Sequence, residues 1–211
     1  MAASSHRPAA THQPGCMAQM AHMMVRLVAG CWLVLGAVWV IAAGRAKKTL
    51  RAAPRWSGPA ARFGLVVLVW ILIGVGVSTQ PLAPVRRVLL MRVPGLEVVG
   101  ALLCVCGVAF AIWARVHIGR NWGMPMSLRQ GHELVTTGPY AYVRHPIYSG
   151  ILLTMLGTAL AVGAGWLLGL LLFGAYFLWS ARAEERDMAE RFPATYPAYR
   201  QRTRRLIPFL L

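Results

Sequence analysis

Acidic side chains are scarce in this sequence, which holds six Asp and Glu residues against 22 Lys and Arg residues. Charged residues make up only 13% of the 211 residues, whereas hydrophobic residues make up 57% and the mean hydropathy is +0.55. A soluble domain ordinarily carries about twice that share of charge. The composition therefore excludes an ordinary soluble protein, and its long apolar runs predict an all-α membrane protein.

Cysteine is rare as well, and the four cysteines form neither a C-x-x-C pair nor the framework of a secreted disulfide-rich domain. His132 and His145 have no partner at a metal-ligand spacing, so no metal centre is predicted. The His and Met residues of the first 23 positions leave soft-metal binding open, beside the simpler interpretation of an unstructured leader.

The net charge of +16 is large enough to raise the question of nucleic-acid binding. However, the Lys and Arg residues lie beside long apolar runs and follow no nucleic-acid-binding pattern. We therefore expect membrane lipids, and no nucleic acid, as their partners.

The chain divides into a tail predicted to be disordered (1–23), N-terminal transmembrane helices (24–94) and a C-terminal region (95–211). A hydrocarbon core needs about 20 apolar residues per helix. This criterion predicts five transmembrane helices, at 24–43, 63–79, 95–114, 147–162 and 166–181. Gly163-Ala164-Gly165 is so short that the last two must form a tight antiparallel helix hairpin.

Basic residues are distributed unevenly over the predicted loops. One side of the membrane receives the loop 44–62, the insert 115–146 and the tail from residue 182, which together hold 17 of the 22 Lys and Arg residues. The positive-inside rule places this side in the cytoplasm and the N-terminus outside. We expect a bacterial inner-membrane protein with a cytosolic insert and tail.

The stretch 131–150 is polar, aromatic and bears histidine, although it lies between apolar helices. Irregular polar backbone is tolerated at membrane depth only where protein buries it or it lines a water-accessible cavity. Four of the six acidic residues follow the last predicted span, at Glu184, Glu185, Asp187 and Glu190. The helix hairpin brings these two segments to one end, where we expect the functional site.

These residues carry a family resemblance. The series His132-Glu133-Leu134-Val135, Gly138-Pro139-Tyr140, Arg144-His145-Pro146, Tyr148, Gly150, Glu184-Glu185, Phe192, Tyr196 and Tyr199 resembles the isoprenylcysteine carboxyl methyltransferase superfamily. That superfamily is similar to membrane phospholipid N-methyltransferases and small-thiol methyltransferases. The resemblance covers residues 95 to 210, about half of the chain.

The resemblance implies S-adenosylmethionine bound between the insert and the last helices, without a Rossmann fold. The sequence agrees, because Gly74-Val75-Gly76 lies in an apolar span and follows no strand. The positions that match cofactor-associated positions of the family are His132, Leu134, Val135, Tyr140, His145, Pro146, Ile147, Tyr148 and Glu184. Glu185 is a further candidate for binding the cofactor. Tyrosine rings suit the sulfonium cation, and carboxylates suit the ribose hydroxyls or the ammonium group.

Arg144 and Arg182 are the candidates for orienting a carboxylate acceptor. The family's substrate arginine corresponds more closely to Ser180 here, so the acceptor stays open among a lipophilic small molecule or modified cysteine carrying a carboxylate, thiol or amine. A second hypothesis is an accessory membrane protein of a cobalt, zinc and cadmium resistance system, with or without methyl transfer and beside a metal-efflux system. A third is a lipid-binding or structural protein.

Overall fold

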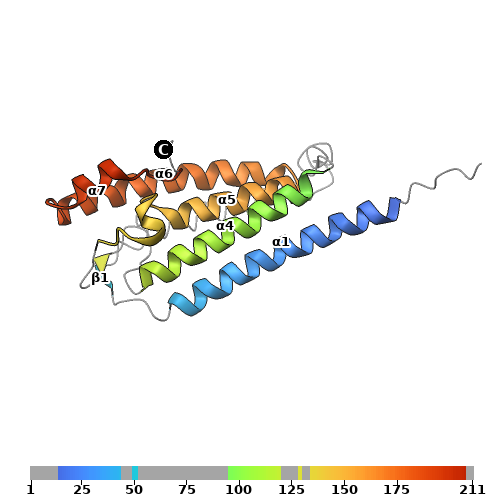
Figure 1. The fold of residues 1–211 in the computed structure, drawn as a ribbon, viewed down its shortest axis with the longest axis horizontal. Coiled ribbons are helices and arrows are strands. Elements are labelled where there is room, and N and C mark those ends of the chain that lie inside the picture. The colour runs from blue at the N-terminus through green and yellow to red at the C-terminus, as the bar shows by residue number, and fades with distance from the viewer. Residues whose placement is uncertain (1–13, 44–48, 52–94, 120–127, 130–133, 208–211) are drawn as a thin grey trace, which may run out of the picture.

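A computed structural model describes residues 14–43, 49–51, 95–119, 128–129 and 134–207 of the chain. The long helices lie side by side along one direction (Figure 1). In chain order the elements are α1 (Pro14–Ala43), β1 (Thr49–Arg51), α4 (Leu96–Ile118), β2 (Leu128–Arg129), the 3-10 helix η3 (Gly138–Ala141), α5 (Pro146–Val162), α6 (Gly165–Arg191) and α7 (Tyr196–Arg202).

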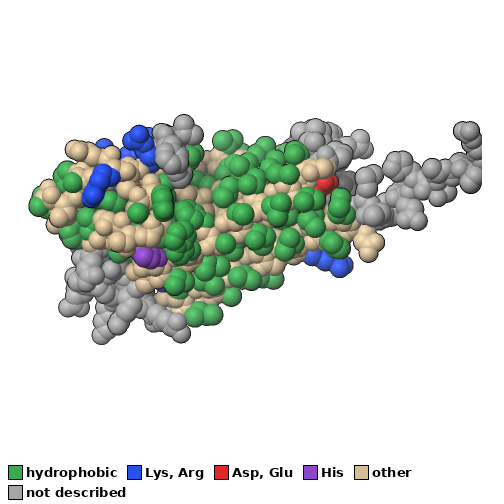
Figure 2. All heavy atoms as spheres, in the orientation of Figure 1, with side chains coloured by type: hydrophobic (Ala, Val, Ile, Leu, Met, Phe, Trp, Pro, Cys, Tyr) green, Lys and Arg blue, Asp and Glu red, His purple; other side chains and the backbone are tan. Residues whose placement is uncertain are grey.

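The predicted fold class, an all-α membrane protein, is confirmed. Three helices are long and apolar enough to cross a membrane, over Gln19–Ala42, Leu96–Ile118 and Gly165–Arg191, and the apolar α5 is shorter. Figure 2 shows hydrophobic side chains over the middle of the molecule and Lys and Arg side chains near both ends, the arrangement expected for helices in a bilayer. The predicted span 63–79 lies outside the described residues, so the number of five spans stays a prediction.

Two helices are longer than the sequence analysis expected. Helix α1 begins at Pro14, whereas residues up to 23 were predicted to be a disordered tail. The segment 16–24 consists largely of Ala, Met and Gln, which favour helix, and it contains neither Gly nor Pro. Helix α6 continues past residue 181 to Arg191, so Glu184 and Glu185 lie on its last turns rather than beyond it.

Glycines set the close packing of α4 against α5. Gly100 and Gly107 on α4 face Gly157 and Gly150 on α5. A Cβ atom at Gly107 would lie 2.5 Å from the backbone nitrogen of Thr154, and one at Gly150 would lie 2.7 Å from that of Ala111. The two backbones therefore touch, as small residues allow in membrane helix pairs.

Polar groups inside this helix pair bond locally. The Thr154 hydroxyl donates to the Gly150 carbonyl at 2.8 Å, and the Thr158 hydroxyl donates to the Thr154 carbonyl at 2.7 Å. Trp32 of α1 donates its indole N–H to the Thr158 hydroxyl at 3.1 Å. Buried side-chain hydroxyls are thus satisfied, which a bilayer interior requires.

Helices α1 and α4 end at the same end of the bundle (Figure 1). The buried Arg115 guanidinium donates to the carbonyls of Gly119 and Ala42, each at 2.9 Å, and so ties the two helix ends together. Strands β1 and β2 pair antiparallel just beyond them. The loop after α1 and the insert after α4 therefore share one end, as the sidedness argument predicted.

The predicted antiparallel hairpin is formed by α5 and α6. Their turn is two residues long, at Gly163 and Ala164. The hairpin returns the last turns of α6 to the beginning of α5, where η3 and α7 also lie (Figure 1). All segments that the sequence singled out after residue 134 consequently meet at one end of the bundle.

Candidate functional site

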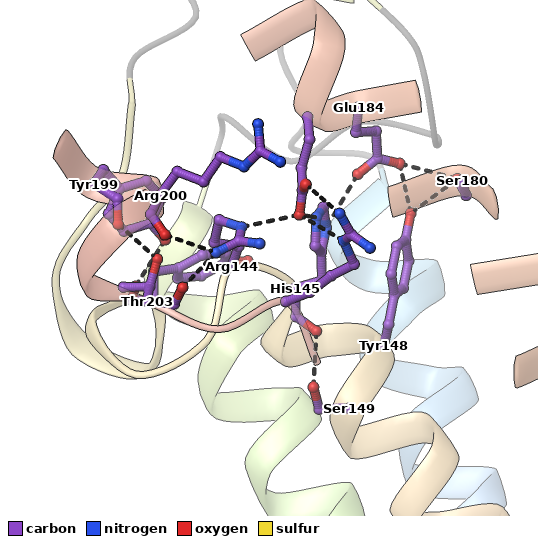
Figure 3. A network of polar contacts seen from close by, with 12 residues as sticks. Arg144, His145, Tyr148, Ser149, Ser180, Glu184, Tyr199, Arg200 and Thr203 are labelled. Carbon is purple, nitrogen blue, oxygen red and sulfur yellow. Dashed lines mark hydrogen bonds and ion pairs between the residues drawn. The ribbon is translucent and has the colours of Figure 1, made fainter. Parts of the chain in front are cut away.

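A network of polar side chains joins the first turn of α5, the last turns of α6 and the chain after α7 (Figure 3). Arg144 and His145 directly precede α5, Tyr148 lies in its first turn, and Ser180, Glu184 and Glu185 come from α6. The carboxyl-terminal residues 203–206 complete the network. The predicted meeting of the motif at 144–148 with the acidic pair is thus observed.

The backbone after α7 pairs with the backbone before α5. The amides of Arg144 and His145 donate to the carbonyls of Arg204 and Arg205 at 2.8 and 3.1 Å, and Val143 and Arg204 form a parallel bridge. The Ser149 hydroxyl donates to the Leu206 carbonyl. We call residues 203–207 the C-terminal arm. The arm fixes the entry of the chain into α5.

The 3-10 helix η3 is held against the end of α4. Gly138 begins η3 with a φ of +59°, a conformation that favours glycine. A Cβ atom there would lie 2.6 Å from the ring of His117. His117 Nε2 lies 2.9 Å from the Thr137 hydroxyl, and its ring stacks on Tyr140. His117 is a contributor that the motif analysis missed, because it lies on the preceding helix.

Glu185 is buried and surrounded by cations. Its Oε1 accepts hydrogen bonds from Nε of Arg144 and Nε of Arg205, both at 2.9 Å, and its Oε2 accepts from Nη2 of Arg205 at 2.8 Å. Its side chain is only 6% exposed. Arg144 also donates to the carbonyls of Arg200 and Thr203. Both groups are therefore occupied by partners within the protein.

Glu184 is more accessible, with 23% of its side chain exposed. Its Oε1 accepts hydrogen bonds from the Tyr148 hydroxyl at 2.6 Å and from the Ser180 hydroxyl at 3.1 Å. Its Oε2 lies 3.4 Å from Nδ1 of His145. Glu184 thus keeps acceptor capacity and an exposed edge, which Glu185 does not.

His145 lies between the two carboxylates. Its Nδ1 faces Glu184, and its Nε2 lies 3.5 Å from Oε1 of Glu185 without the alignment of a hydrogen bond. The ring stacks on Tyr148 with centroids 5.4 Å apart, and Tyr148 stacks on Phe177 at 4.4 Å. The stacked Tyr148 ring therefore fixes the plane of the imidazole, and a carboxylate lies near each of its two nitrogen atoms.

The protonation of His145 couples to folding. Burial lowers its pKa, but the nearby carboxylates of Glu184 and Glu185 outweigh burial and raise the pKa above its ordinary value. Because the folded-state pKa is raised, the imidazolium stabilises the folded state below the ordinary pKa of about 6.5. This contribution is lost as the pH rises through the folded-state pKa.

We therefore predict that the free energy of unfolding falls as the pH rises above about 6.5, the ordinary pKa of histidine, and that His145→Gln removes this part of the slope. Unfolding in detergent micelles, followed by circular dichroism at several pH values, measures it. His22→Gln, at an exposed position of α1, is the control and should retain the wild-type slope. An unchanged slope in His145→Gln would contradict the prediction.

The other predicted site residues are mostly buried or half-buried. Tyr140 and Ile147 belong to a buried cluster with Ala114, and Val135 packs against it. Burial raises the pKa of Tyr140, so its phenol stays neutral. Pro146 is buried at the first position of α5, and Leu134 is half-buried. His132 lies outside the described residues.

The two predicted substrate-orienting arginines differ in their surroundings. Arg144 is in the network, where Glu185 and two carbonyls occupy its guanidinium. Arg182 is exposed on α6, whereas its neighbours Ala181 and Glu185 are buried. The structure thus unites Arg144 with the acidic pair and leaves Arg182 on the outer face of the helix.

Sequence reasoning missed Arg205 and Phe177, and it did not assign Ser180 to the site. Ser180 precedes Glu184 by four residues, and this helical spacing was a usable signal. Arg205 approaches Glu185 only through tertiary structure, so no spacing could have shown it. Among the described residues, no group of three His, Cys, Asp or Glu side chains could hold a metal ion.

Fold and site together define an all-α membrane protein with a polar centre at one end of a helix hairpin. Residues 96–195 match the family model described as phospholipid methyltransferase. This part of the chain is therefore similar to the phospholipid methyltransferase family, and the predicted likeness to the isoprenylcysteine carboxyl methyltransferases is confirmed.

Three relatives illustrate this likeness. The chain is 45% identical over 80 residues to methanethiol S-methyltransferase 2 of Bradyrhizobium diazoefficiens, with 38% of the chain and 30% of the relative covered. It is 37% identical over 101 residues to protein-S-isoprenylcysteine O-methyltransferase of Schizosaccharomyces pombe, covering 46% and 43%. It is 33% identical over 96 residues to cobalt-zinc-cadmium resistance protein CzcN of Cupriavidus metallidurans, covering 44% of each. The matched region spans less than half the length of each relative.

Proposed function

We propose that this protein is an S-adenosylmethionine-dependent methyltransferase whose cofactor binds beside Glu184, His145 and Tyr148. The observation that supports it best is the partly exposed carboxylate of Glu184, held 2.6 Å from the Tyr148 hydroxyl and 3.4 Å from the His145 ring. The relatives named as methyltransferases support the reaction class.

The residues suit the chemical groups of this cofactor. It carries a sulfonium, an ammonium group and ribose hydroxyls, and Glu184 retains acceptor capacity for such donors. The stacked rings of His145, Tyr148 and Phe177 make a rigid aromatic wall next to that carboxylate. Tyr148 and Ser180 donate to Glu184 and fix its orientation before anything binds.

When bound, S-adenosylmethionine supplies a methyl group whose bond to sulfur breaks, the electron pair staying on sulfur, as the acceptor's lone pair forms the new bond. No proton needs to reach the leaving sulfur, so the residues of the site act by positioning and electrostatics. His145 has carboxylates at both ring nitrogens, which disfavours a role as general base. An acceptor carboxylate would compete with Glu185 for Arg144, so the orienting roles of Arg144 and Arg182 stay predictions.

We infer a lipophilic or membrane-delivered acceptor with a carboxylate, thiol or amine nucleophile, because the site lies at one end of helices that are long and apolar enough to cross a membrane. The names of the relatives include a thiol and an isoprenylcysteine methyltransferase, and so span two of these acceptor classes. With the N-terminus outside a bacterial inner membrane, the site faces the cytoplasm. Incubating membranes with labelled cofactor and identifying the labelled product would assign the acceptor.

Cofactor binding is the direct test. Calorimetric titration of the purified protein should detect S-adenosylmethionine binding, and His145→Ala and Glu184→Ala should each weaken it at least about tenfold, the loss expected for a charge-assisted hydrogen bond. Glu190→Ala, which removes an exposed carboxylate of the same helix, should bind as the wild type does. Absence of binding to the wild type, or unchanged binding in both site variants, would refute the proposal.

The similarity to CzcN favours a second candidate, an accessory role in cobalt, zinc and cadmium resistance. The Glu184→Ala variant separates the two possibilities in a deletion strain. If it restores metal resistance while it cannot bind the cofactor, the accessory role is independent of methyl transfer. If only the wild type restores resistance, methyl transfer serves it.

A further inference from the structure

We propose that Arg205, in the C-terminal arm, is a positioning residue of the cofactor site, acting through Glu185 to hold His145 against Glu184. This inference rests on the proposed function. It gives the two adjacent glutamates different tasks: Glu184 contacts the cofactor, and Glu185 is the anchor around which the site is assembled.

The carboxylate of Glu185 is occupied by two arginines. Arg205 binds it with two parallel hydrogen bonds, from Nε to Oε1 at 2.9 Å and from Nη2 to Oε2 at 2.8 Å. This bidentate geometry is the strongest that a guanidinium makes with a carboxylate. With Arg144 also on Oε1, the 6% exposed side chain of Glu185 presents little acceptor surface to a ligand.

The backbone around Arg205 holds the entry to α5. Its carbonyl accepts the His145 amide at 3.1 Å, and the carbonyl of Arg204 accepts the Arg144 amide at 2.8 Å. The same residue therefore holds His145 by its main chain and Glu185 by its side chain. A shift of the arm would therefore move both the backbone of His145 and the Glu185 carboxylate that faces its Nε2.

The position of His145 depends on these contacts. It directly precedes α5, with a φ of −125° and a ψ of 61°. Its carbonyl accepts the Ser149 amide of α5 at 3.1 Å, whereas its own amide is held by the arm. Its ring is set by Tyr148 stacking and by the two carboxylates. Loss of the pair between Arg205 and Glu185 leaves Glu185 held by Arg144 alone and removes the side-chain anchor of the arm. His145 is then held less firmly against Glu184.

Arg204 provides a matched control in the adjacent position. Its main chain takes part in the same pairing, but its side chain is exposed. Arg204→Gln and Arg205→Gln remove the same charge from the same arm. A difference between them therefore measures the pair with Glu185, not the general positive potential of the arm.

The experiment measures S-adenosylmethionine affinity by calorimetry and amide hydrogen exchange over residues 142–149 by mass spectrometry. Arg205→Gln should weaken the cofactor about tenfold or more and speed exchange at Arg144 and His145, whereas Arg204→Gln should match the wild type in both. Arg205→Lys, which keeps the charge but not the bidentate geometry, should be intermediate. In a Glu185→Gln background the Arg205→Gln substitution should add little further loss.

Three results would overturn the inference: wild-type affinity in Arg205→Gln, an equal loss in Arg204→Gln, or additive losses in the double variant. If Arg205→Gln does not fold, Arg205→Lys and the Glu185→Gln background give the same comparison. If the wild type binds no cofactor, the proposed function is refuted. The hydrogen-exchange rates at Arg144 and His145 then still show whether Arg205 positions His145. Unchanged exchange in Arg205→Gln would then refute the positioning role alone.

Discussion

Glu185→Ala is expected to lower the free energy of unfolding by about 3–5 kcal/mol, the cost of breaking a buried ion pair by removing one partner. The substitution leaves Arg144 and Arg205 facing each other without the carboxylate that both bind. Their side chains are 9% and 23% exposed, so water screens the uncompensated charge only in part. His145, raised in pKa partly by the same carboxylate, also loses a partner.

Equilibrium unfolding in mixed micelles, followed by circular dichroism, measures this loss. Glu190→Ala is the matched control, because Glu190 is an exposed glutamate five residues later on α6, and it should change stability by no more than about 0.5 kcal/mol. Equal effects of the two substitutions would show that the pairs around Glu185 contribute nothing particular. A cycle with Arg205→Gln would then be expected to show no coupling either.

Two neighbouring residues of identical type thus have different roles. Glu184 is 23% exposed and bonds neutral hydroxyls, so its truncation should affect ligand binding more than folding. Glu185 is buried and binds two arginines, so its truncation should affect folding more than ligand binding. Sequence alone could not assign these roles, because adjacent glutamates on a helix differ by about 100° in direction and only the packing of α6 decides which one is buried.

Other parts of the site were predictable for a physical reason. The turn between α5 and α6 is too short to do anything but bring Arg144 and His145 back to Glu184 and Glu185, and the structure shows that meeting. The roles of these residues toward a cofactor stay predictions. Arg205 lies 20 residues from Glu185, beyond the end of α6 and the whole of α7, and its contact depends on the arm pairing with residues 143–145.

The fold, like the site, has parts that could be predicted from the sequence and parts that could not. Apolar runs of sufficient length predicted the helices, because the length of a membrane span is fixed by the bilayer. Helix ends were less predictable, since α1 and α6 extend into polar sequence where the bilayer no longer sets the limit. A signal for helix pairing was present but not used: Gly100 and Gly107, like Gly150 and Gly157, recur at a seven-residue spacing that repeats on one helix face.

Because these glycines let α4 and α5 touch, Gly157→Leu is expected to lower the free energy of unfolding by about 3 kcal/mol or more. This value is at the upper end of the cost of overpacking. A Cβ atom at Gly157 would lie 2.5 Å from the Gly100 carbonyl oxygen and 2.9 Å from the Cys104 Cα. These obstacles are backbone atoms, so no side-chain rotation relieves the clash. The two helices must separate, and the Thr158 hydroxyl next to Gly157 then loses the approach of Trp32.

Gly36→Leu is the control, because Gly36 is also a helical glycine, but a Cβ atom there would meet no neighbouring atom of the described residues within 4 Å, and its α1 site is exposed. A leucine there adds apolar surface toward lipid and should leave stability and folded yield unchanged. Thermal unfolding and size-exclusion profiles of both variants in one detergent measure the difference. A Gly157→Leu protein as stable as Gly36→Leu would mean that α4 and α5 need not approach to backbone contact. His145 and Tyr148 lie at the start of α5, before and within its first turn, and His117 lies in the last turn of α4. Separating these helices should therefore also displace the site, and cofactor affinity should fall with stability in Gly157→Leu alone.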